Sequence, residues 1–269
     1  MNEWLLTHEP GIRLGCFLSV LLAMMVWEWQ QPRRLLGLAR ARRWPANLGL
    51  IAIDTVMLRL FFPLLAVGAA QVAANNGWGL FHWLEIPLTT AVIASLLVLD
   101  LAVYAQHVAF HKLTPLWRLH RTHHTDLDLD VTTALRFHPL EIMLSMLIKL
   151  ALVTALGVPP VAVLLFEVLL NATAMFNHSN VYCSPKLDRL LRWLIVTPDM
   201  HRVHHSIHRT ETDSNFGFNL PWWDRLFGTY QDQPQDGHPG MIIGLEYFRD
   251  WRAIRLDGLL LQPFLKPKP

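Results

Sequence analysis

The stretch from His107 to His205 decides how this chain folds, because histidine clusters recur in it between apolar segments. The clusters read HVAFH at 107–111, HRTHH at 120–124 and HRVHH at 201–205, and His138 and His178 stand singly between them. Residues three or four positions apart share one face of a helix, so each cluster can aim two or three imidazoles at one point. A single pair of this kind is common on solvated surfaces. Three clusters, two of them with identical spacing, predict a metal site.

Composition places this site in a membrane protein. Of the 269 residues, 52% are hydrophobic and only 16% are charged, and the mean hydropathy is positive. This is too apolar for an ordinary soluble domain. The formal charge of +2 gives no indication of a nucleic-acid partner. Cys16 and Cys183 are the only cysteines, which excludes a disulfide framework and a sulfur-ligated zinc or iron–sulfur site.

Five apolar runs are long enough to cross a hydrocarbon core of about 30 Å. They cover residues 11–29, 47–74, 86–111, 140–156 and 161–176. The last two flank the short break at 157–160 and predict a helical hairpin. The expected fold is therefore an all-α membrane bundle of four to five segments, with a cytoplasmic helical cap that carries the histidine boxes.

The arginines predict the orientation of the bundle. Five of them follow the first apolar run, between residues 33 and 43, whereas the turn at 75–79 contains no Lys or Arg. Cytoplasmic loops are enriched in these residues. We therefore expect every histidine cluster on the cytoplasmic side, in the inner membrane if the protein is bacterial. The start of the chain lacks a basic region, so we expect a retained anchor. The expected division is membrane segments at 1–90, a histidine-box domain at 91–235 and a cytoplasmic tail at 236–269.

The number of histidines predicts two metal ions. Nine histidines, or ten with His138, exceed what one ion can use, since zinc takes about four ligands and octahedral iron about six. Carboxylates are expected to accept the outer ring N–H groups. Asp100 and Tyr104 share a helical stripe with the first cluster. Asp100 could accept a hydrogen bond from a ligand imidazole or make a purely structural hydrogen bond. Glu141 follows His138 by three residues and fits an outer role or direct ligation.

The remaining polar residues are given less specific roles. Three aspartates follow the second cluster, and we expect them to form a solvated acidic loop: Asp126, Asp128 and Asp130. His8, His82 and His238 lie far from the clusters in the sequence and are predicted to be surface residues.

These motifs, in this order, resemble the fatty acid hydroxylase/sterol desaturase superfamily of membrane dimetal oxygenases. The resemblance covers roughly residues 90 to 235 and rests on the clusters with their flanking residues: Asp100 to His111, Trp117 to His124, Arg136-Phe-His138-Pro-Leu-Glu141, His178-Ser-Asn180, Thr197 to His205, Asn215-Phe-Gly217 and Trp223 to Thr229. Two departures are Val108, where many members have Arg, and Tyr182, where some branches carry another histidine. Neither removes a box, and the branch stays open.

The resemblance implies an O2-dependent oxidoreductase that hydroxylates or desaturates a lipid. It implies metal ligation by nine histidines, with His138 less secure: His107, His111, His120, His123, His124, His178, His201, His204 and His205. The implied cofactors are two iron ions, for which zinc can substitute in purified protein, and O2 is the co-substrate. No flavin, nicotinamide or iron–sulfur motif is present, so a separate reductase or small redox protein is the expected electron donor, with a membrane lipid as substrate.

Two other functions fit the same residues. One is a membrane zinc enzyme or metal-handling protein that uses the same histidines, and the other is a catalytically silent member that binds lipid. The sequence does not distinguish a fatty acyl chain from a sterol or another lipid.

Overall fold

The computed structural model describes residues 2–266 and is all-helical, with two isolated β-bridges and no strand in that range. Five segments are long and apolar enough to cross a membrane, which indicates a multi-pass membrane protein and confirms the predicted fold class. Four are single helices: α2 (Glu9–Gln30), α6 (Leu88–Lys112), α8 (Pro139–Leu156) and α9 (Pro160–His178). The fifth, Arg40–Trp83, contains α3 (Arg40–Phe61), α4 (Ala66–Asn75) and α5 (Leu80–Trp83).

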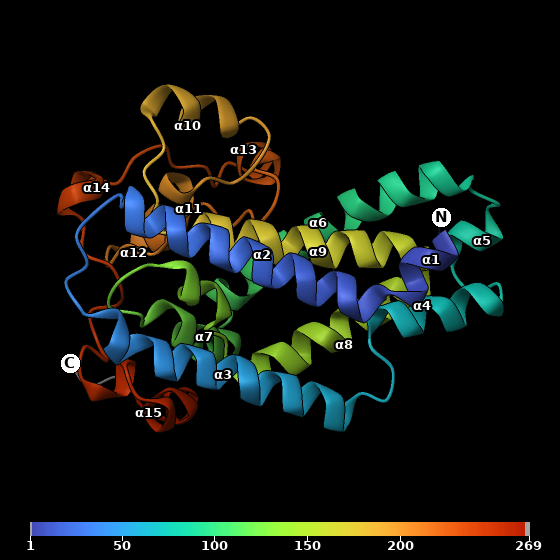
Figure 1. The fold of residues 1–269 in the computed structure, drawn as a ribbon, viewed down its shortest axis with the longest axis horizontal. Helices are drawn as coiled ribbons and strands as arrows, with labels where there is room; N and C mark the ends of the chain where they lie inside the picture. The colour runs from blue at the N-terminus through green and yellow to red at the C-terminus, as the bar shows by residue number, and fades with distance from the viewer. Residues whose placement is uncertain (1, 267–269) are drawn as a thin grey trace.

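Whereas α1 (Asn2–Thr7) and α5 lie at one end of the bundle, most of the short helices gather at the other end (Figure 1). This end contains the C-termini of α2 and α9 and the start of α3. Its elements are α7 (Thr114–His124), η1 (Val131–Leu135), α10 (Pro185–Leu191), α11 (Pro198–His204), α12 (Arg209–Thr212), α13 (Trp222–Phe227), α14 (Gly237–Gly240), η2 (Trp251–Ala253), α15 (Leu256–Leu261) and η3 (Gln262–Phe264).

The second apolar run folds as two helices. The break at 62–65 contains Pro63, which has no backbone N–H and disfavours a helical conformation in the residue before it. By contrast, α2 is continuous. One of its stripes, at Leu14, Leu18 and Leu22, is 45–59% exposed. Apolar side chains four positions apart that face outward are expected where a helix faces lipid.

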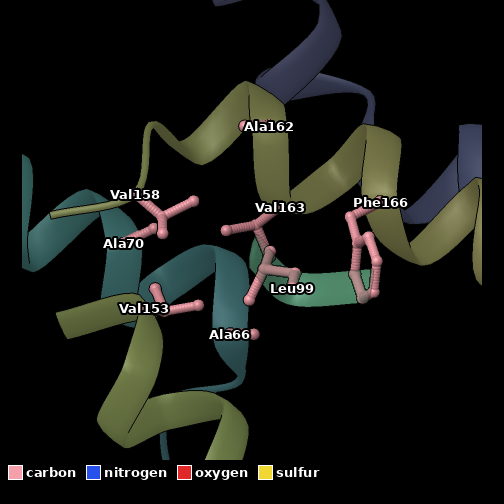
Figure 2. Packing of buried hydrophobic residues seen from close by; sticks show 8 residues of the cluster. All are labelled: Ala66, Ala70, Leu99, Val153, Val158, Ala162, Val163 and Phe166. Atoms are coloured by element: carbon pink, nitrogen blue, oxygen red, sulfur yellow. The ribbon is translucent and has the colours of Figure 1, made fainter. Parts of the chain in front are cut away.

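The predicted hairpin joins α8 to α9 at the end of the bundle opposite α7 (Figure 1). α8 ends at Gly157, whose φ of 68° is left-handed and favours glycine. A Cβ added to Gly79 would lie 2.1 Å from the Gly157 nitrogen, so the turn between α4 and α5 packs directly on the hairpin turn. Next to these turns, α4, α6, α8 and α9 bury a core of small and branched side chains that includes Ala66, Leu99 and Phe166 (Figure 2).

The C-terminal segment returns to the bundle. Leu259 of α15 packs against Ala46 and Leu50 of α3. The Arg121 guanidinium on α7 donates hydrogen bonds to the carbonyls of Gln262 and Leu265. The segment from α15 to Leu265 therefore forms part of the packing around α3 and α7.

Candidate metal centre

The histidines reach one region because the helices that carry them end there. His107 and His111 lie in the last two turns of α6, and His178 is the last residue of α9. The other six lie on or directly after α7 and α11. All nine are buried, with exposed fractions of 5% or less.

The nine imidazoles form two groups, in each of which the candidate ligand atoms all lie within 4.8 Å of one another. The first group contains His107, His111, His120, His124 and His204, and the second contains His123, His178, His201 and His205. Each HxxHH motif therefore divides between the groups. Its first and last histidines, one helical turn apart, share a group, and the fourth residue of the motif joins the other. This division differs from the expectation that each cluster aims at a single point, and it places the two groups side by side.

Outer hydrogen bonds fix the rings of the first group. Nδ1 of His107 donates to the Phe216 carbonyl at 2.8 Å, and Nδ1 of His204 donates to the Ser214 carbonyl at 2.7 Å. A carbonyl can only accept, so the proton of each ring is on Nδ1 and Nε2 keeps its lone pair. Nδ1 of His120 lies 2.7 Å from Glu141 Oε1, which orients that ring in the same way.

The inner nitrogens of this group then face one another as acceptors. Nε2 of His107 and Nε2 of His120 lie 3.1 Å apart, and these protonation states give that contact no hydrogen to share. Two nitrogens bound to one ion at about 2.1 Å and at right angles are also about 3 Å apart. Nε2 of His111, His124 and His204 has no hydrogen-bond partner among residues 2–266. A bound cation satisfies all five nitrogens.

In the second group, too, Nδ1 atoms donate outward to carbonyls and Nε2 atoms face one another. Nδ1 of His178 donates to the Ala174 carbonyl at 2.8 Å, and Nδ1 of His123 donates to the Arg136 carbonyl at 3.2 Å. Their Nε2 atoms lie 3.0 Å apart, and Nε2 of His201 is also 3.0 Å from Nε2 of His178. Neither nitrogen of His205 has a partner in the described part of the chain. The donor set therefore fits a second metal ion.

Burial keeps these rings neutral, as metal ligation requires. It lowers the pKa of His120 to about 3. Burial, followed by the charges of neighbouring rings, also lowers the pKa of His123, His124, His204 and His205 well below the ordinary value for histidine. The lone pairs are therefore available at neutral pH.

A tight loop holds the carbonyls that orient the first group. Both oxygens of Asp224 accept backbone N–H groups at 2.8 Å, from Phe216 and from Gly217. A Cβ on Gly217 would lie 2.7 Å from Asp224 Oδ2, which explains the glycine. Asn215, with a φ of 50°, donates its side-chain amide to the Met200 carbonyl at 2.9 Å. The Asn215-Phe-Gly217 and Asp224 motifs therefore act on the histidines through the backbone.

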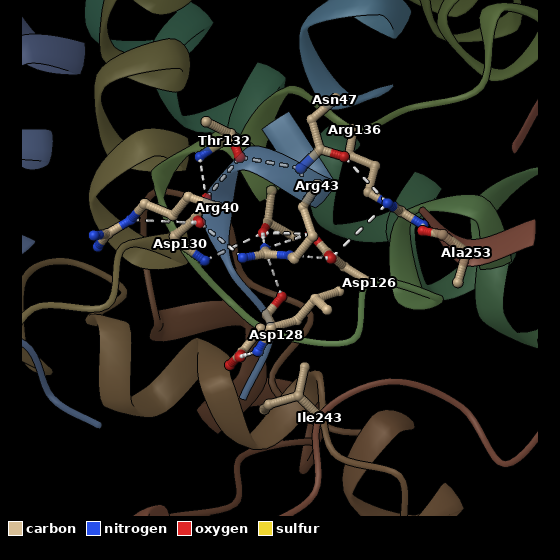
Figure 3. Close-up of polar contacts among 12 residues, drawn as sticks. Arg40, Arg43, Asn47, Asp126, Asp128, Asp130, Thr132, Arg136, Ile243 and Ala253 are labelled. Atoms are coloured by element: carbon tan, nitrogen blue, oxygen red, sulfur yellow. Dashed lines mark hydrogen bonds and ion pairs between the residues drawn. The ribbon is translucent and has the colours of Figure 1, made fainter. Parts of the chain in front are cut away.

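A buried ion network holds the segment between α7 and α8 (Figure 3). Arg43 donates to both oxygens of Asp126, at 2.7 and 2.8 Å, to Asp130 Oδ2 at 2.8 Å and to the Asp128 carbonyl at 2.8 Å. The three aspartates are at most 2% exposed, so the expected solvated acidic loop is wrong. The reason is that α3, which carries Arg43, packs across this segment. The Arg136 guanidinium extends the network to Asn47 and Ala253.

Three predicted site residues make no hydrogen bond to the histidines of either group. In His138, Nδ1 accepts the Leu140 backbone N–H as a helix cap and Nε2 lies 3.2 Å from the Leu260 carbonyl. Asp100 accepts from Trp223 Nε1 at 2.8 Å and from the Leu220 backbone, which is the structural alternative left open for it. The Tyr104 hydroxyl lies 2.9 Å from the Thr229 hydroxyl, and its ring stacks on Phe227.

Sequence reasoning missed several groups around the histidines. Asp213 Oδ1 lies 3.4 Å from His111 Nδ1 and also belongs to the ion pairs of Lys112 and Arg209. Four outer partners are backbone carbonyls, which no residue type reveals. His238, predicted to be a surface residue, is only 4% exposed, because α14 folds back over Asp199.

Comparison with known proteins agrees with this geometry. Alkylglycerol monooxygenase of Xenopus tropicalis is 29% identical over 246 residues, covering 88% of this chain and 50% of the relative. Ornithine lipid hydroxylase OlsE of Rhizobium tropici is 28% identical, covering 65% of this chain and 51% of the relative. Cholesterol 25-hydroxylase of Rattus norvegicus is 24% identical, covering 58% of this chain and 55% of the relative.

The chain spans about half the length of the curated relatives it matches. These relatives are lipid hydroxylases and monooxygenases, and hence oxidoreductases. No solved structure matches the chain significantly. Residues 92–229, half of the chain and the part that holds the nine histidines of the two groups, match the model of the fatty acid hydroxylase family, and the chain belongs to that family.

Proposed function

We propose that this protein is a membrane-bound diiron oxygenase that hydroxylates a lipid with dioxygen and external electrons. The observation that carries the proposal is the pair of imidazole groups, in which ring N–H groups are donated outward and unshared lone pairs converge inward. The names of the relatives support hydroxylation over desaturation.

In this proposal the first group, His107, His111, His120, His124 and His204, holds one ion and the second, His123, His178, His201 and His205, holds the other. Bound iron would supply the dioxygen chemistry that attacks an unactivated C–H bond. The chain's own residues set ligand geometry through outer hydrogen bonds, of which Glu141 to His120 is the one made by a buried carboxylate. His138 is left out of the ligand set because both its nitrogens have backbone partners.

The surroundings support a lipid-soluble substrate. The groups lie where α6 and α9, two of the candidate membrane segments, end. A substrate dissolved in the bilayer would therefore lie close to both histidine groups. We place the histidine groups on the cytoplasmic side, in the inner membrane if the protein is bacterial. Residues 91–235 would form the catalytic unit, 1–90 its membrane support and 236–269 a cytoplasmic tail. A separate reductase or small redox protein is proposed to deliver electrons.

The test is oxygen incorporation. Purified protein loaded with iron is mixed with a lipid extract, a reductase system and isotopically labelled dioxygen, and the lipids are analysed by mass spectrometry. The proposal predicts a lipid that gains one labelled oxygen atom with the wild type and with His82→Ala, whose exposed histidine lies at the opposite end of the bundle. It predicts no such product with His204→Ala.

The alternatives give different results. A zinc enzyme or metal-handling protein would bind metal tightly but incorporate no labelled oxygen with iron, zinc or both. A silent lipid-binding member would show no product, and His204→Ala would leave the growth phenotype of the host unchanged.

A further inference from the structure

A second polar site lies on the other side of α11 from the histidines. It is a cavity of about 440 Å³ between α10, α13 and the segment that leads to α14, and we call it the α10–α13 pocket. Its lining includes four arginines and one buried histidine: Arg33, Arg189, Arg192, Arg225 and His238. None of them takes part in either histidine group.

The charges of this pocket are not balanced. Its three acidic residues are already engaged: Asp199 pairs with Arg33 and Arg202, whereas Asp188 and Asp232 both pair with Arg192. Arg189 makes no hydrogen bond or ion pair within residues 2–266, and Arg225 stacks on Trp193 and Tyr230 without an acidic partner there. Two cationic side chains of the pocket therefore remain without a counter-ion.

Buried donors among the lining residues also lack hydrogen-bond partners. Arg192 is 2% exposed, and its Nη2 has no hydrogen-bond acceptor within the described residues. His238 is 4% exposed, and neither of its ring nitrogens has a hydrogen-bond partner in the same part of the chain. Nε2 of His238 lies 3.6 Å from Asp199 Oδ2. A buried donor without an acceptor is destabilising, so an anion that accepts from both groups would be stabilised.

The surroundings of the pocket resemble a membrane interface. Figure 1 shows α10 and α13 to one side of the bundle, near the ends of α2 and α9. The two helices and the turn after α10 expose large apolar side chains, with Leu190 63%, Trp193 60%, Leu226 69% and Phe227 55% exposed. Tryptophan and arginine next to exposed leucines are favoured where hydrocarbon meets headgroups.

We propose that the α10–α13 pocket binds the anionic headgroup, a phosphate or a carboxylate, of a membrane lipid. Arg189, Arg192 Nη2 and His238 would donate to its oxygens, since guanidinium groups recognise such anions through paired hydrogen bonds. The acyl chains would lie along the exposed apolar side chains of α10 and α13. That the bound lipid is a substrate rests on the proposed function, whereas its binding does not.

Binding can be measured on the full-length protein in neutral detergent, without an electron donor. Native mass spectrometry would compare dioleoyl phosphatidic acid with dioleoylglycerol, which has the same chains and no charge, and inorganic phosphate would be added as a competitor. We expect phosphatidic acid to bind at least about tenfold more tightly than dioleoylglycerol, as charge-assisted hydrogen bonds predict.

The variants make the test specific to the pocket. Arg189→Gln, at an exposed residue without partners, should weaken phosphatidic acid binding up to about fivefold, and Arg189→Lys should restore much of it. His238→Gln should weaken binding about tenfold. Arg255→Gln, at an exposed arginine of the Asp257 ion pair outside the pocket, is the matched control and should bind as the wild type does.

Two results would overturn the proposal. Equal binding of phosphatidic acid by the wild type, Arg189→Gln and His238→Gln would show that the lipid binds elsewhere. Displacement of phosphatidic acid by equimolar inorganic phosphate would indicate a site for a free anion instead. The binding assay measures no turnover, so its results do not depend on whether the protein hydroxylates a lipid. Loss of binding would in turn not contradict the proposed metal site.

Discussion

Replacing Arg43 by methionine should destabilise the protein strongly. Arg43 is fully buried and donates five hydrogen bonds, to Asp126, Asp130, Thr133 and the Asp128 carbonyl. Methionine fills a similar volume but leaves Asp126 and Asp130 as buried carboxylates without this partner. Removing one partner of a buried ion pair costs about 3–5 kcal/mol. The apparent Tm should then fall by roughly 10 °C.

Arg43→Met should also weaken metal binding. The network holds the segment that ends at Arg136, whose carbonyl orients the His123 ring. We therefore expect Arg43→Met to lower metal occupancy as well as stability, and Arg43→Lys, which keeps the charge without the fork of donors, to give an intermediate Tm.

The assay is thermal unfolding in detergent, followed by intrinsic fluorescence, with metal content measured on the same samples. Arg255→Met is the control, because its pair with Asp257 is exposed and should contribute less than about 1 kcal/mol. A Tm for Arg43→Met within 2 °C of that of the control would refute the reasoning that this network holds the segment.

Three further predictions follow from the site. Glu141→Gln weakens the acceptor for His120 Nδ1 and should lower metal affinity about 10–100-fold in a chelator competition; an unchanged affinity would remove Glu141 from the centre. His138→Ala should keep the metal content of the wild type, because both of its nitrogens have backbone partners, and a loss of metal on elemental analysis would contradict this. Burial raises the pKa of Asp126, but Arg43 and Arg136 outweigh it and hold the pKa at about 2. This pKa lies below that of the same group in the unfolded chain, so the ionised carboxylate stabilises the fold by about 2 kcal/mol. The stabilisation should be complete above pH about 4 and be lost as the pH falls towards 2. A wild-type Tm that does not change across this range would contradict the prediction.

The bundle and the clustering of the nine histidines were predictable because both depend on local patterns. Hydropathy over about twenty residues marks a membrane segment, and i, i+4 spacing places His107 and His111 on one face. The interruption at Pro63 also has a local cause. The confirmed fold class shows that apolar runs of this length suffice to identify the helices.

The residues whose environment was predicted wrongly are buried by contacts between distant parts of the chain. Arg43 lies 83 residues from Asp126, so an acidic run that appears solvated in the sequence becomes a buried network. His238 is buried through its approach to Asp199, which the composition of its own loop does not reveal. The division of each HxxHH motif between two groups also requires the packing angle between α7 and α11, which spacing alone does not fix.

The most direct test of the account is the ratio of metal to protein in the wild type, His204→Ala and His178→Ala, measured by elemental analysis after expression with iron and zinc available. Two separate imidazole groups predict about two ions per wild-type chain and a lower ratio in each variant, because each change removes a ligand from a different group. One ion or none in the wild type, with the fold intact, would contradict the two-metal centre.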